Sequence, residues 1–586
     1  PFRESRRVGW VGDLESSAKT PFVVSHLDPA GTYVFLGFDG NGHGTHVAGI
    51  AAGFAGYEGG ITGLAPGAQI MSLKALGSSG DGNWEDISAA VQYAAEQGAD
   101  IISISVGGVM DISEEDSEES RLIARVAEEY GVLFVLAVGN GGPGVGSAVT
   151  PGAVTGSITV GAFVSPEMWR QQYGYQVPEP GLWSFSAVGP RKDGGPAPDI
   201  VAPGSALSTV PEWFAPRGQA WFEGTSMAVP HVAGAAALLL DASRRAGMRV
   251  DAAALATALI ESAESVPGYH LVEQGYGLLN LYEAWRALKD AAGAGGLVRL
   301  HEDGRTVRGL YYRGGPLPGR VEVQVENLSE DVLRLSFSEV PGWLALEPAD
   351  LTLPPGTSRP LALLYRGQEP GLYSGVIRAT AGDGPVLELW DTVIIPYEFT
   401  RDNNWSVSAE GELGPGRYAR YFFRVPPGAT ELSLTVRTSL DEDRAPMGRV
   451  RLQVFRPDGS MAYTGDYVGA PRETGLSMTR YTLHQPEPGV WEAVVYSSAS
   501  LSDYGLESSR YFIGARISAI CAEGPLRLWL PAGEEAVTLE STLTLINQDW
   551  GFFGGAEGYG LYERPVVARR RLELNADGTR SYLLDP

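Results

Sequence analysis

The chain has 586 residues, more than one hydrophobic core can organise, and this length indicates two to four domains. Its formal net charge of −26, without a cluster of Lys and Arg, argues against a nucleic-acid partner. A single cysteine, Cys521, excludes an intramolecular disulfide, and no apolar run reaches the roughly 18 residues that would span a bilayer.

Short apolar runs and helical patterns alternate in the first half of the chain. In chain order they predict a strand at 33–38, helices at 46–53 and 84–97, a strand at 100–106, a helix at 117–130, strands at 132–138 and 157–164, and helices at 226–245, 252–262 and 278–291. Nearly continuous apolar strands that alternate with helices predict an α/β fold, in which helices cover both faces of a parallel sheet.

The pattern changes at the glycine-rich residues 292–296. Residues 297–400 alternate apolar and polar positions between turn clusters, which predicts an antiparallel β-sandwich domain. Residues 401–517 predict a second all-β domain of the jelly-roll kind, and residues 518–586 a partial third β-rich unit.

A histidine motif occupies residues 41–49, with the sequence Asn-Gly-His-Gly-Thr-His-Val-Ala-Gly. His43 precedes a helix of small residues, and such a junction can hold an imidazole in the fixed position that a general base needs. A lone histidine is more often a buried structural residue, and this is the interpretation we prefer for His46. For His43 the whole string favours a functional role.

Two further strings contain candidate functional residues. Ser226 lies in Gly-Thr-Ser-Met-Ala-Val-Pro-His-Val-Ala-Gly at 224–234, at the start of a predicted helix where backbone N–H groups are free and the dipole favours negative charge. Asn140 follows a predicted strand in Ala-Val-Gly-Asn-Gly-Gly at 137–142. Taken singly, the first could be an ordinary helix cap and the second an ordinary turn.

In the order His43, Asn140, Ser226, these strings resemble the motifs of the subtilisin family (subtilases, S8) of serine peptidases. The resemblance covers about residues 33–290 and implies a subtilisin-like peptidase domain at 33–296. It implies that His43 is the general base, that Ser226 is the nucleophile, and that the Asn140 side chain and the Ser226 N–H form the oxyanion hole. It further implies that substrate is bound by Gly80, Gly82, Ser105, Val106, Gly107, Ala137 and Gly139.

The aspartate of the family triad precedes the histidine, yet no Asp-Thr-Gly or Asp-Ser-Gly stands before His43. Asp39 occupies a place where the family often has a non-catalytic acid, Asp28 is followed by proline, and Asp13 has a plausible spacing but the wrong neighbours. The pyrolysin-like and tripeptidyl-peptidase-II-like branch separates the two residues by a long insertion, and residues 1–32 resemble its tail. We therefore expect an aspartate upstream of Pro1, with Asp13 or true absence as alternatives.

The resemblance implies a serine-type endopeptidase that acts on proteins or peptides through an acyl-enzyme. This chemistry requires no cofactor, although structural calcium is common in the family, and the family habit suggests a secreted or cell-envelope location. Three alternatives stay open: a catalytically dead binding module, an exopeptidase that releases tripeptides, and β domains that adhere to carbohydrate through aromatics such as Trp405 or Tyr418. The sequence gives no indication of the oligomeric state.

Overall fold

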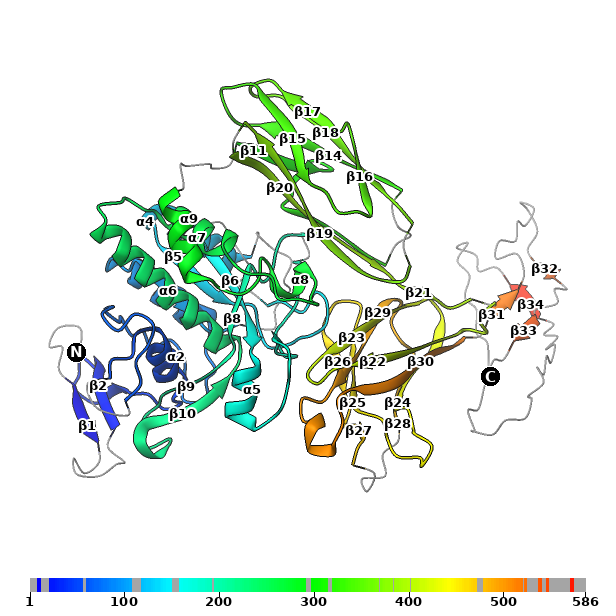
Figure 1. Cartoon of the computed structure of the whole chain (residues 1–586), viewed down its shortest axis with the longest axis horizontal. Coiled ribbons are helices and arrows are strands. Elements are labelled where there is room, and N and C mark those ends of the chain that lie inside the picture. Colours follow the sequence, from blue (N-terminus) through cyan, green and yellow to red (C-terminus); the bar gives the residue numbers. More distant parts are fainter. Residues whose placement is uncertain are drawn as a thin grey trace.

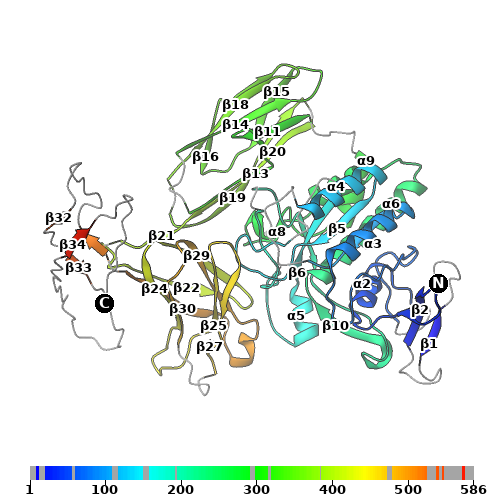
Figure 2. The ribbon, with the colours of Figure 1, turned by 180° about the vertical axis from the view of Figure 1, so that it is seen from behind.

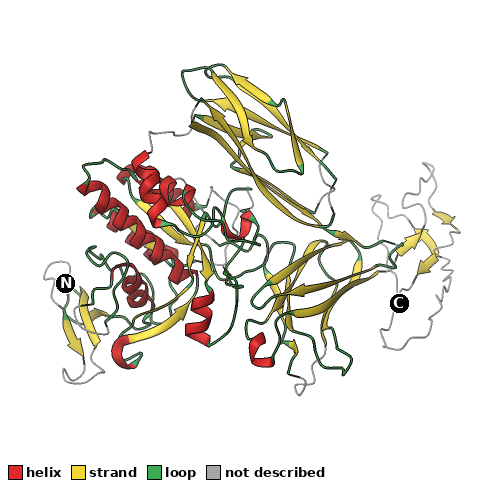
Figure 3. Ribbon diagram, viewed as in Figure 1, coloured by secondary structure: helices red, strands yellow, loops and turns green. Residues whose placement is uncertain are grey.

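The computed structural model describes most of the chain, and the following account is confined to those residues. They are 8–11, 20–55, 60–107, 117–149, 157–191, 194–290, 297–314, 319–367, 369–382, 384–400, 402–471 and 478–519, with four short strands between 521 and 573. The helices gather in the first part of the chain, and strands dominate the rest (Figure 3).

The first part is an α/β domain built on a mainly parallel sheet, as the sequence predicts (Figure 1). Strands β4 (Ile101–Ile104), β5 (Leu133–Ala137), β6 (Ser157–Val164) and β8 (Ile200–Pro203) run parallel, and β7 (Gly181–Leu182) pairs antiparallel with β6. One face packs on α6 (Thr225–Arg245), α7 (Ala252–Glu261) and α9 (Leu281–Asp290), and the other on α3 (Trp84–Glu96) and α4 (Glu118–Tyr130). The remaining elements include α5 (Pro166–Tyr173), α8 (Leu271–Gln274) and a hairpin of β9 (Ser205–Thr209) and β10 (Gln219–Glu223).

The apolar run of β5 shows why helices cover both faces of this sheet. Leu133, Val135 and Ala137 belong to the core under α6, whereas Phe134 and Leu136 belong to the core under α3 and α4. Because successive side chains of a strand point to opposite faces, a strand that is buried on both sides must be apolar throughout.

Helix α6 is the central helix of the domain and fixes the position of α2 (His43–Ala52). A β-carbon on Gly234 would lie 2.8 Å from the Leu64 β-carbon and 2.9 Å from the Ala51 carbonyl oxygen, so only glycine permits the close contact with α2. By length and composition α6 could cross a bilayer, but 61% of its apolar window is buried inside the protein. It is a core helix of this domain.

One predicted strand lies outside the parallel sheet. The apolar run predicted as a strand at 33–38 forms β3 (Val34–Gly37), which pairs antiparallel with β2 (Thr20–Leu27), and β2 pairs with β1 (Gly9–Val11). Figure 2 shows this small sheet beside α2 at the edge of the domain. Its apolar side chains are largely exposed, and Phe35 retains 55% of its accessible surface. An apolar run indicates a strand, but its pairing partners are decided by the tertiary structure.

Residues 297–395 form a sandwich of two sheets that enclose one apolar core. The first sheet has the order β12 (Arg305–Thr306), β11 (Val298–Glu302), β14 (Arg320–Asn327), β18 (Ser358–Tyr365) and β16 (Leu344–Glu347). The second has the order β13 (Gly309–Arg313), β20 (Gly384–Ile395), β19 (Gly371–Ala381), β15 (Leu333–Glu339) and β17 (Asp350–Leu353).

Residues 397–519 form a second two-sheet unit, which we call the jelly-roll domain. One sheet contains β21 (Tyr397–Glu398), β23 (Tyr418–Val425), β29 (Gly489–Ser497), β25 (Arg449–Phe455), β26 (Met461–Thr464) and β27 (Val468–Gly469). The other contains β22 (Ser406–Leu413), β30 (Ser509–Ala519), β24 (Ala429–Thr438) and β28 (Met478–His484). Beyond it, β31 (Cys521–Glu523) pairs with β33 (Thr544–Ile546), and β32 (Ala536–Leu539) with β34 (Arg570–Glu573). The β-rich character of this half is thus as predicted.

A buried acid makes the stability of the sandwich dependent on pH. Asp391 is fully buried, accepts a hydrogen bond from Tyr365, and has one carboxylate oxygen without a partner among the described residues. Burial raises the pKa of Asp391 to about 8. The folded chain therefore holds this proton more tightly than the unfolded chain, and stability should fall as the pH rises from about 4 to about 8.

We predict that Asp391→Asn removes this loss and raises the melting temperature at pH 8, because the amide carries no charge. Each kcal/mol added to the free energy of unfolding should raise the melting temperature of a domain of this size by about 4–8 °C. Thermal denaturation of the full chain between pH 5 and pH 8.5 provides the measurement, with Asp350→Asn, at an exposed position of β17, as the control. An unchanged pH slope in Asp391→Asn would contradict the assignment.

Candidate active site

Ser226 is the second residue of α6, and its backbone and side chain are tied to the end of β4. The Ser226 hydroxyl donates to the Ser105 carbonyl oxygen over 3.1 Å, and the Ser105 hydroxyl donates to the Ser226 carbonyl oxygen over 3.0 Å. Gly224, directly before the helix, has φ 149°, a conformation that residues with a β-carbon rarely adopt. The start of α6 is therefore fixed against the carboxyl end of the sheet.

Asn140 follows β5 and is joined to the same helix terminus. Its Oδ1 accepts hydrogen bonds from the Thr225 backbone N–H at 2.9 Å and from the Thr225 hydroxyl at 3.0 Å. Two donors on one atom settle the amide orientation and leave Nδ2 available as a donor on the exposed side. Gly139, with φ 108°, packs so closely on Val149 that a β-carbon would approach it to 2.7 Å.

His43 is the first residue of α2 and is half-buried. Burial lowers the pKa of its imidazole, and the negative charge of Asp39 partly opposes this effect. Among the residues that the structure describes, none forms a hydrogen bond with the His43 ring. Among the same residues, the Ser226 hydroxyl donates to the Ser105 carbonyl oxygen and not to the His43 ring.

The acids before His43 have other partners. Asp39 accepts from the backbone N–H groups of Asn41 and Gly42 at 3.0 and 2.7 Å and from the Thr45 hydroxyl, so its carboxylate closes the first turn of α2. Asp28 binds Thr32 in the exposed turn between β2 and β3. Asp13 lies outside the described residues.

His46 has the environment of a structural residue. It is fully buried, stacks on Phe222 with ring centroids 4.4 Å apart, and bonds through Nε2 to the Ala220 carbonyl oxygen over 3.0 Å. Burial lowers the pKa of His46 to about 4, so the ring is neutral near pH 7.

The residues that we expect to bind substrate lie on three segments of the peptidase domain. Gly80, with φ 88°, and Gly82 belong to an exposed turn, and the Asn41 side chain donates to the Ser78 carbonyl oxygen in that turn over 3.2 Å. Ser105, Val106 and Gly107 continue β4 toward Ser226, and Ala137 and Gly139 continue β5 toward Asn140. Asn41 thus joins the histidine motif to the turn at Gly80. Ser226 joins the serine motif to the segment that contains Ser105.

Comparison with known proteins gives a match to one family. Residues 36–278 match the model of the subtilase family, Peptidase S8. Pyrolysin of Pyrococcus furiosus is 32% identical over 81% of this chain and 37% of its own length. Tripeptidyl-peptidase 2 of Drosophila melanogaster is 29% identical over 67% of this chain and 30% of its own length.

The chain belongs to the subtilase family. It spans only about a third of the length of these two relatives. A crystal structure of tripeptidyl peptidase 2 superposes with a TM-score of 0.70 over 92% of this chain and 44% of that one, at 23% identity, and so shares the fold.

Two contacts of this subtilase were not predicted from the sequence. Thr225 orients the Asn140 amide, and the reciprocal pair of Ser105 and Ser226 joins β4 to α6. Thr225 stands inside the serine motif, and Ser105 is one of the residues that we expect to bind substrate, so the sequence indicated the neighbourhood of both. Partners separated by 85 and 121 residues cannot be read from spacing along the chain.

We predict that the pKa of His43 lies below its ordinary value of about 6.5, and that Asp39→Asn lowers it further. Asparagine can still accept from the turn N–H groups, so mainly the charge is lost. Histidine NMR titration of the full chain gives both values, with His43→Gln to assign the signal. Asp28→Asn should leave the titration unchanged, and a midpoint above 6.5 would contradict this account of the site.

Proposed function

We propose that this subtilase is a serine endopeptidase that hydrolyses peptide bonds through an acyl-enzyme on Ser226. The observation that carries the proposal is the meeting of Ser226, Ser105 and the Asn140–Thr225 pair at the start of α6. A hydroxyl, an amide donor and a helix N-terminus then surround one point, where a carbonyl oxygen could acquire negative charge.

In the proposed reaction His43 takes the proton of the Ser226 hydroxyl as its oxygen attacks the carbonyl carbon of the scissile peptide. The Asn140 Nδ2 and the Ser226 N–H donate to the oxyanion, and protonated His43 gives its proton to the leaving amine. A water activated by His43 then hydrolyses the acyl-enzyme. The Ser226 hydroxyl must first turn from the Ser105 carbonyl toward His43, which requires a rotation of one side-chain torsion.

Among the residues that the structure describes, no carboxylate forms a hydrogen bond with the His43 ring. Asp39 is engaged in the first turn of α2. Asp28 is bound to Thr32. Asp13 is therefore the remaining aspartate before His43 in this sequence. Neutral His43 near pH 7, which follows from its lowered pKa, suits a general base.

We propose that substrate lies as an extended peptide between the turn at Gly80 and Gly82 and the segment Ser105–Gly107, with Ala137 and Gly139 lining the site. The acyl transfer requires no cofactor. Structural calcium is the metal we would expect, and the described residues bring no three His, Cys, Asp or Glu side chains together as a metal-binding group. We further propose that the protein is secreted or lies in the cell envelope. Its proposed substrates are proteins or peptides.

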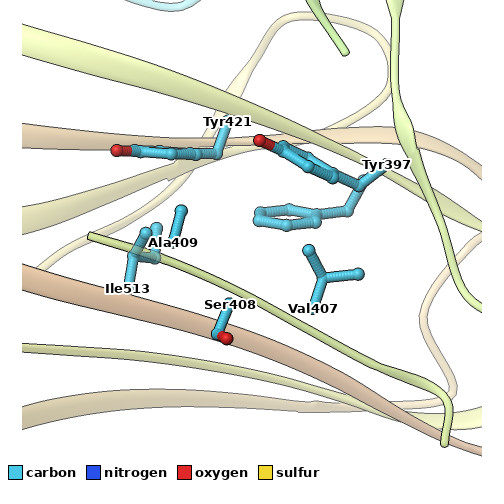
Figure 4. Close-up of a pocket in the computed structure, with 7 residues that line it drawn as sticks. Tyr397, Val407, Ser408, Ala409, Tyr421 and Ile513 are labelled. Atoms are coloured by element: carbon cyan, nitrogen blue, oxygen red, sulfur yellow. The ribbon is translucent and has the colours of Figure 1, made fainter. Parts of the chain in front are cut away.

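The adhesion alternative has less support. Trp405 packs against the jelly-roll core, and the Tyr418 hydroxyl binds Glu273 of the peptidase domain over 2.8 Å. A small recess of about 140 Å³ lies in the jelly-roll domain beside Tyr397, Tyr421 and Val407 (Figure 4). That volume includes open solvent, and the walls leave no room for a water molecule, so no sugar ring can enter the recess.

We predict that Asn140→Ala lowers kcat by about 10²–10³-fold, the magnitude known for a subtilisin, and changes KM little. An oxyanion donor acts on the charged transition state more than on the bound substrate. Steady-state hydrolysis of a peptide amide gives both constants, and Asn403→Ala, in the turn before β22 of the jelly-roll domain, is the matched control. Unchanged turnover in Asn140→Ala would remove this residue from the reaction.

A protein substrate with an acetylated amino terminus distinguishes the endopeptidase from an exopeptidase that releases tripeptides. We expect internal cleavage of this substrate at a rate close to that of the unblocked one, because an endopeptidase does not bind the amino terminus. Mass spectrometry of the products gives the cleavage positions, and Ser226→Ala provides the inactive control. Products confined to tripeptides from the unblocked substrate would favour the exopeptidase.

A further inference from the structure

The loop that follows Asn140 is held by both β domains. Residues 141–147 leave the end of β5 and lie where the peptidase domain meets the sandwich and the jelly-roll domain. The ends of the loop are fixed within the peptidase domain, because the Gly142 N–H donates to the Phe185 carbonyl oxygen over 2.9 Å and the Val149 N–H donates to that of Val138 over 2.9 Å. The N–H groups of Gly146 and Ser147 donate to the Val188 carbonyl oxygen of the peptidase domain over 3.0 and 2.9 Å, and the middle of the loop is bound by the β domains as well.

Both backbone groups of Val145 bond to side chains of the β domains. Its N–H donates to Glu492 Oε2 on β29 of the jelly-roll domain over 2.8 Å. Its carbonyl oxygen accepts from Arg313 on β13 of the sandwich over 2.7 Å. The Pro143 carbonyl oxygen accepts from Arg420 on β23. Three charged side chains from two domains therefore hold three backbone groups of one short loop.

Two of these charges, Arg420 and Glu492, are buried and bind each other. Arg420 lies 2.8 Å from Glu492 and also bonds to Glu273 on α8, and the exposed fractions of their side chains are 6%, 0% and 3%. Arg420 lowers the pKa of Glu273 against the opposing effect of burial. A buried ion pair seldom adds net stability compared with apolar residues of the same size, but it fixes its partners in one geometry.

The loop also fits the β domains sterically. A β-carbon on Gly144 would lie 2.3 Å from the Phe455 ring, and one on Gly459 would lie 2.4 Å from the Gly146 carbonyl oxygen. Val145 itself is fully buried in a cluster to which all three domains contribute: Val188, Val272, Leu372, Ile394, Phe422 and Val490. Displacing the loop would thus disturb apolar packing as well as hydrogen bonds.

We propose that Glu492, Arg420 and Arg313 are positioning residues, which hold the loop 141–147 and so place the Asn140 amide for the oxyanion. The inference rests on the proposed function of Asn140. Only four residues separate Asn140 from the peptide N–H that Glu492 binds, so we expect a shift at Val145 to reach that side chain by way of the Gly142–Phe185 contact. A misplacement of about 1 Å in an active site can cost on the order of 10²-fold in rate.

The test compares Glu492→Leu, Glu492→Gln and Tyr418→Phe in the full chain. Leucine removes the acceptor for the Val145 N–H, while Arg420 keeps Glu273 as its ion-pair partner. Glutamine keeps an acceptor oxygen. Tyr418→Phe is the matched control, because its hydroxyl bonds to Glu273 in the same buried cluster but not to the loop.

We expect Glu492→Leu to lower kcat by about 10–100-fold with KM changed less than about threefold, and Glu492→Gln to recover most of the loss. Tyr418→Phe should leave kcat close to that of the parent. Hydrogen exchange should quicken in residues 141–147 of Glu492→Leu and stay slow in Tyr418→Phe. A general loosening of the interface would instead lower the melting temperature and kcat of all three variants together, and that result would overturn the inference.

The same substitution in the Asn140→Ala background separates this inference from the proposed function. If Glu492 acts through Asn140, Glu492→Leu should slow Asn140→Ala no further. An equal loss in both backgrounds, or no loss in the parent, overturns the positioning role while leaving the oxyanion role of Asn140 intact. If Asn140→Ala alone turns over at the parental rate, the oxyanion role of Asn140 is contradicted, and the positioning role that rests on it falls as well. If Glu492→Leu does not fold, Arg313→Met is used instead, again in both the parent and the Asn140→Ala background. This substitution removes the donor to the Val145 carbonyl oxygen.

Discussion

The start of α6 rests against the carboxyl ends of β4 and β5, and the geometry of the site depends on that contact. Ser105 and Ser226 exchange hydrogen bonds between the strand and the helix, and Thr225 binds the Asn140 side chain from the next strand. The close packing of α6 on α2 at Gly234 determines where the helix that begins with His43 can lie. Groups from three distant segments thus meet because one helix contacts all of them.

Burial gives the two histidines of one motif different properties. His46 lies inside the domain, stacked on Phe222, and its low pKa keeps it neutral over the range in which proteins usually work. His43 opens the same helix at its half-buried end, where Asp39 partly offsets the effect of burial on its pKa. The two residues are three positions apart, so the environment rather than the residue type decides which one can exchange a proton.

The β domains belong to the same structural unit as the peptidase domain. Buried charges and an apolar cluster connect all three parts at the loop after Asn140. Burying a charged side chain costs free energy unless that side chain is paired. An interface whose only task was to attach an accessory module could be built from apolar residues alone. The ionic cluster instead fixes one relative arrangement of loop and domains.

The sequence by itself determined the α/β fold of the first part, the β-rich second part and the strings around His43, Asn140 and Ser226, because hydrophobic period and local motifs are properties of neighbouring residues. It also predicted a structural position for His46, which is buried and stacked on Phe222. The tertiary structure alone decided that β3 pairs outside the parallel sheet, that the Ser226 hydroxyl faces Ser105, and that Glu492 binds the loop after Asn140. Each of these contacts joins residues by packing rather than by spacing, and Glu492 lies 347 residues from its partner.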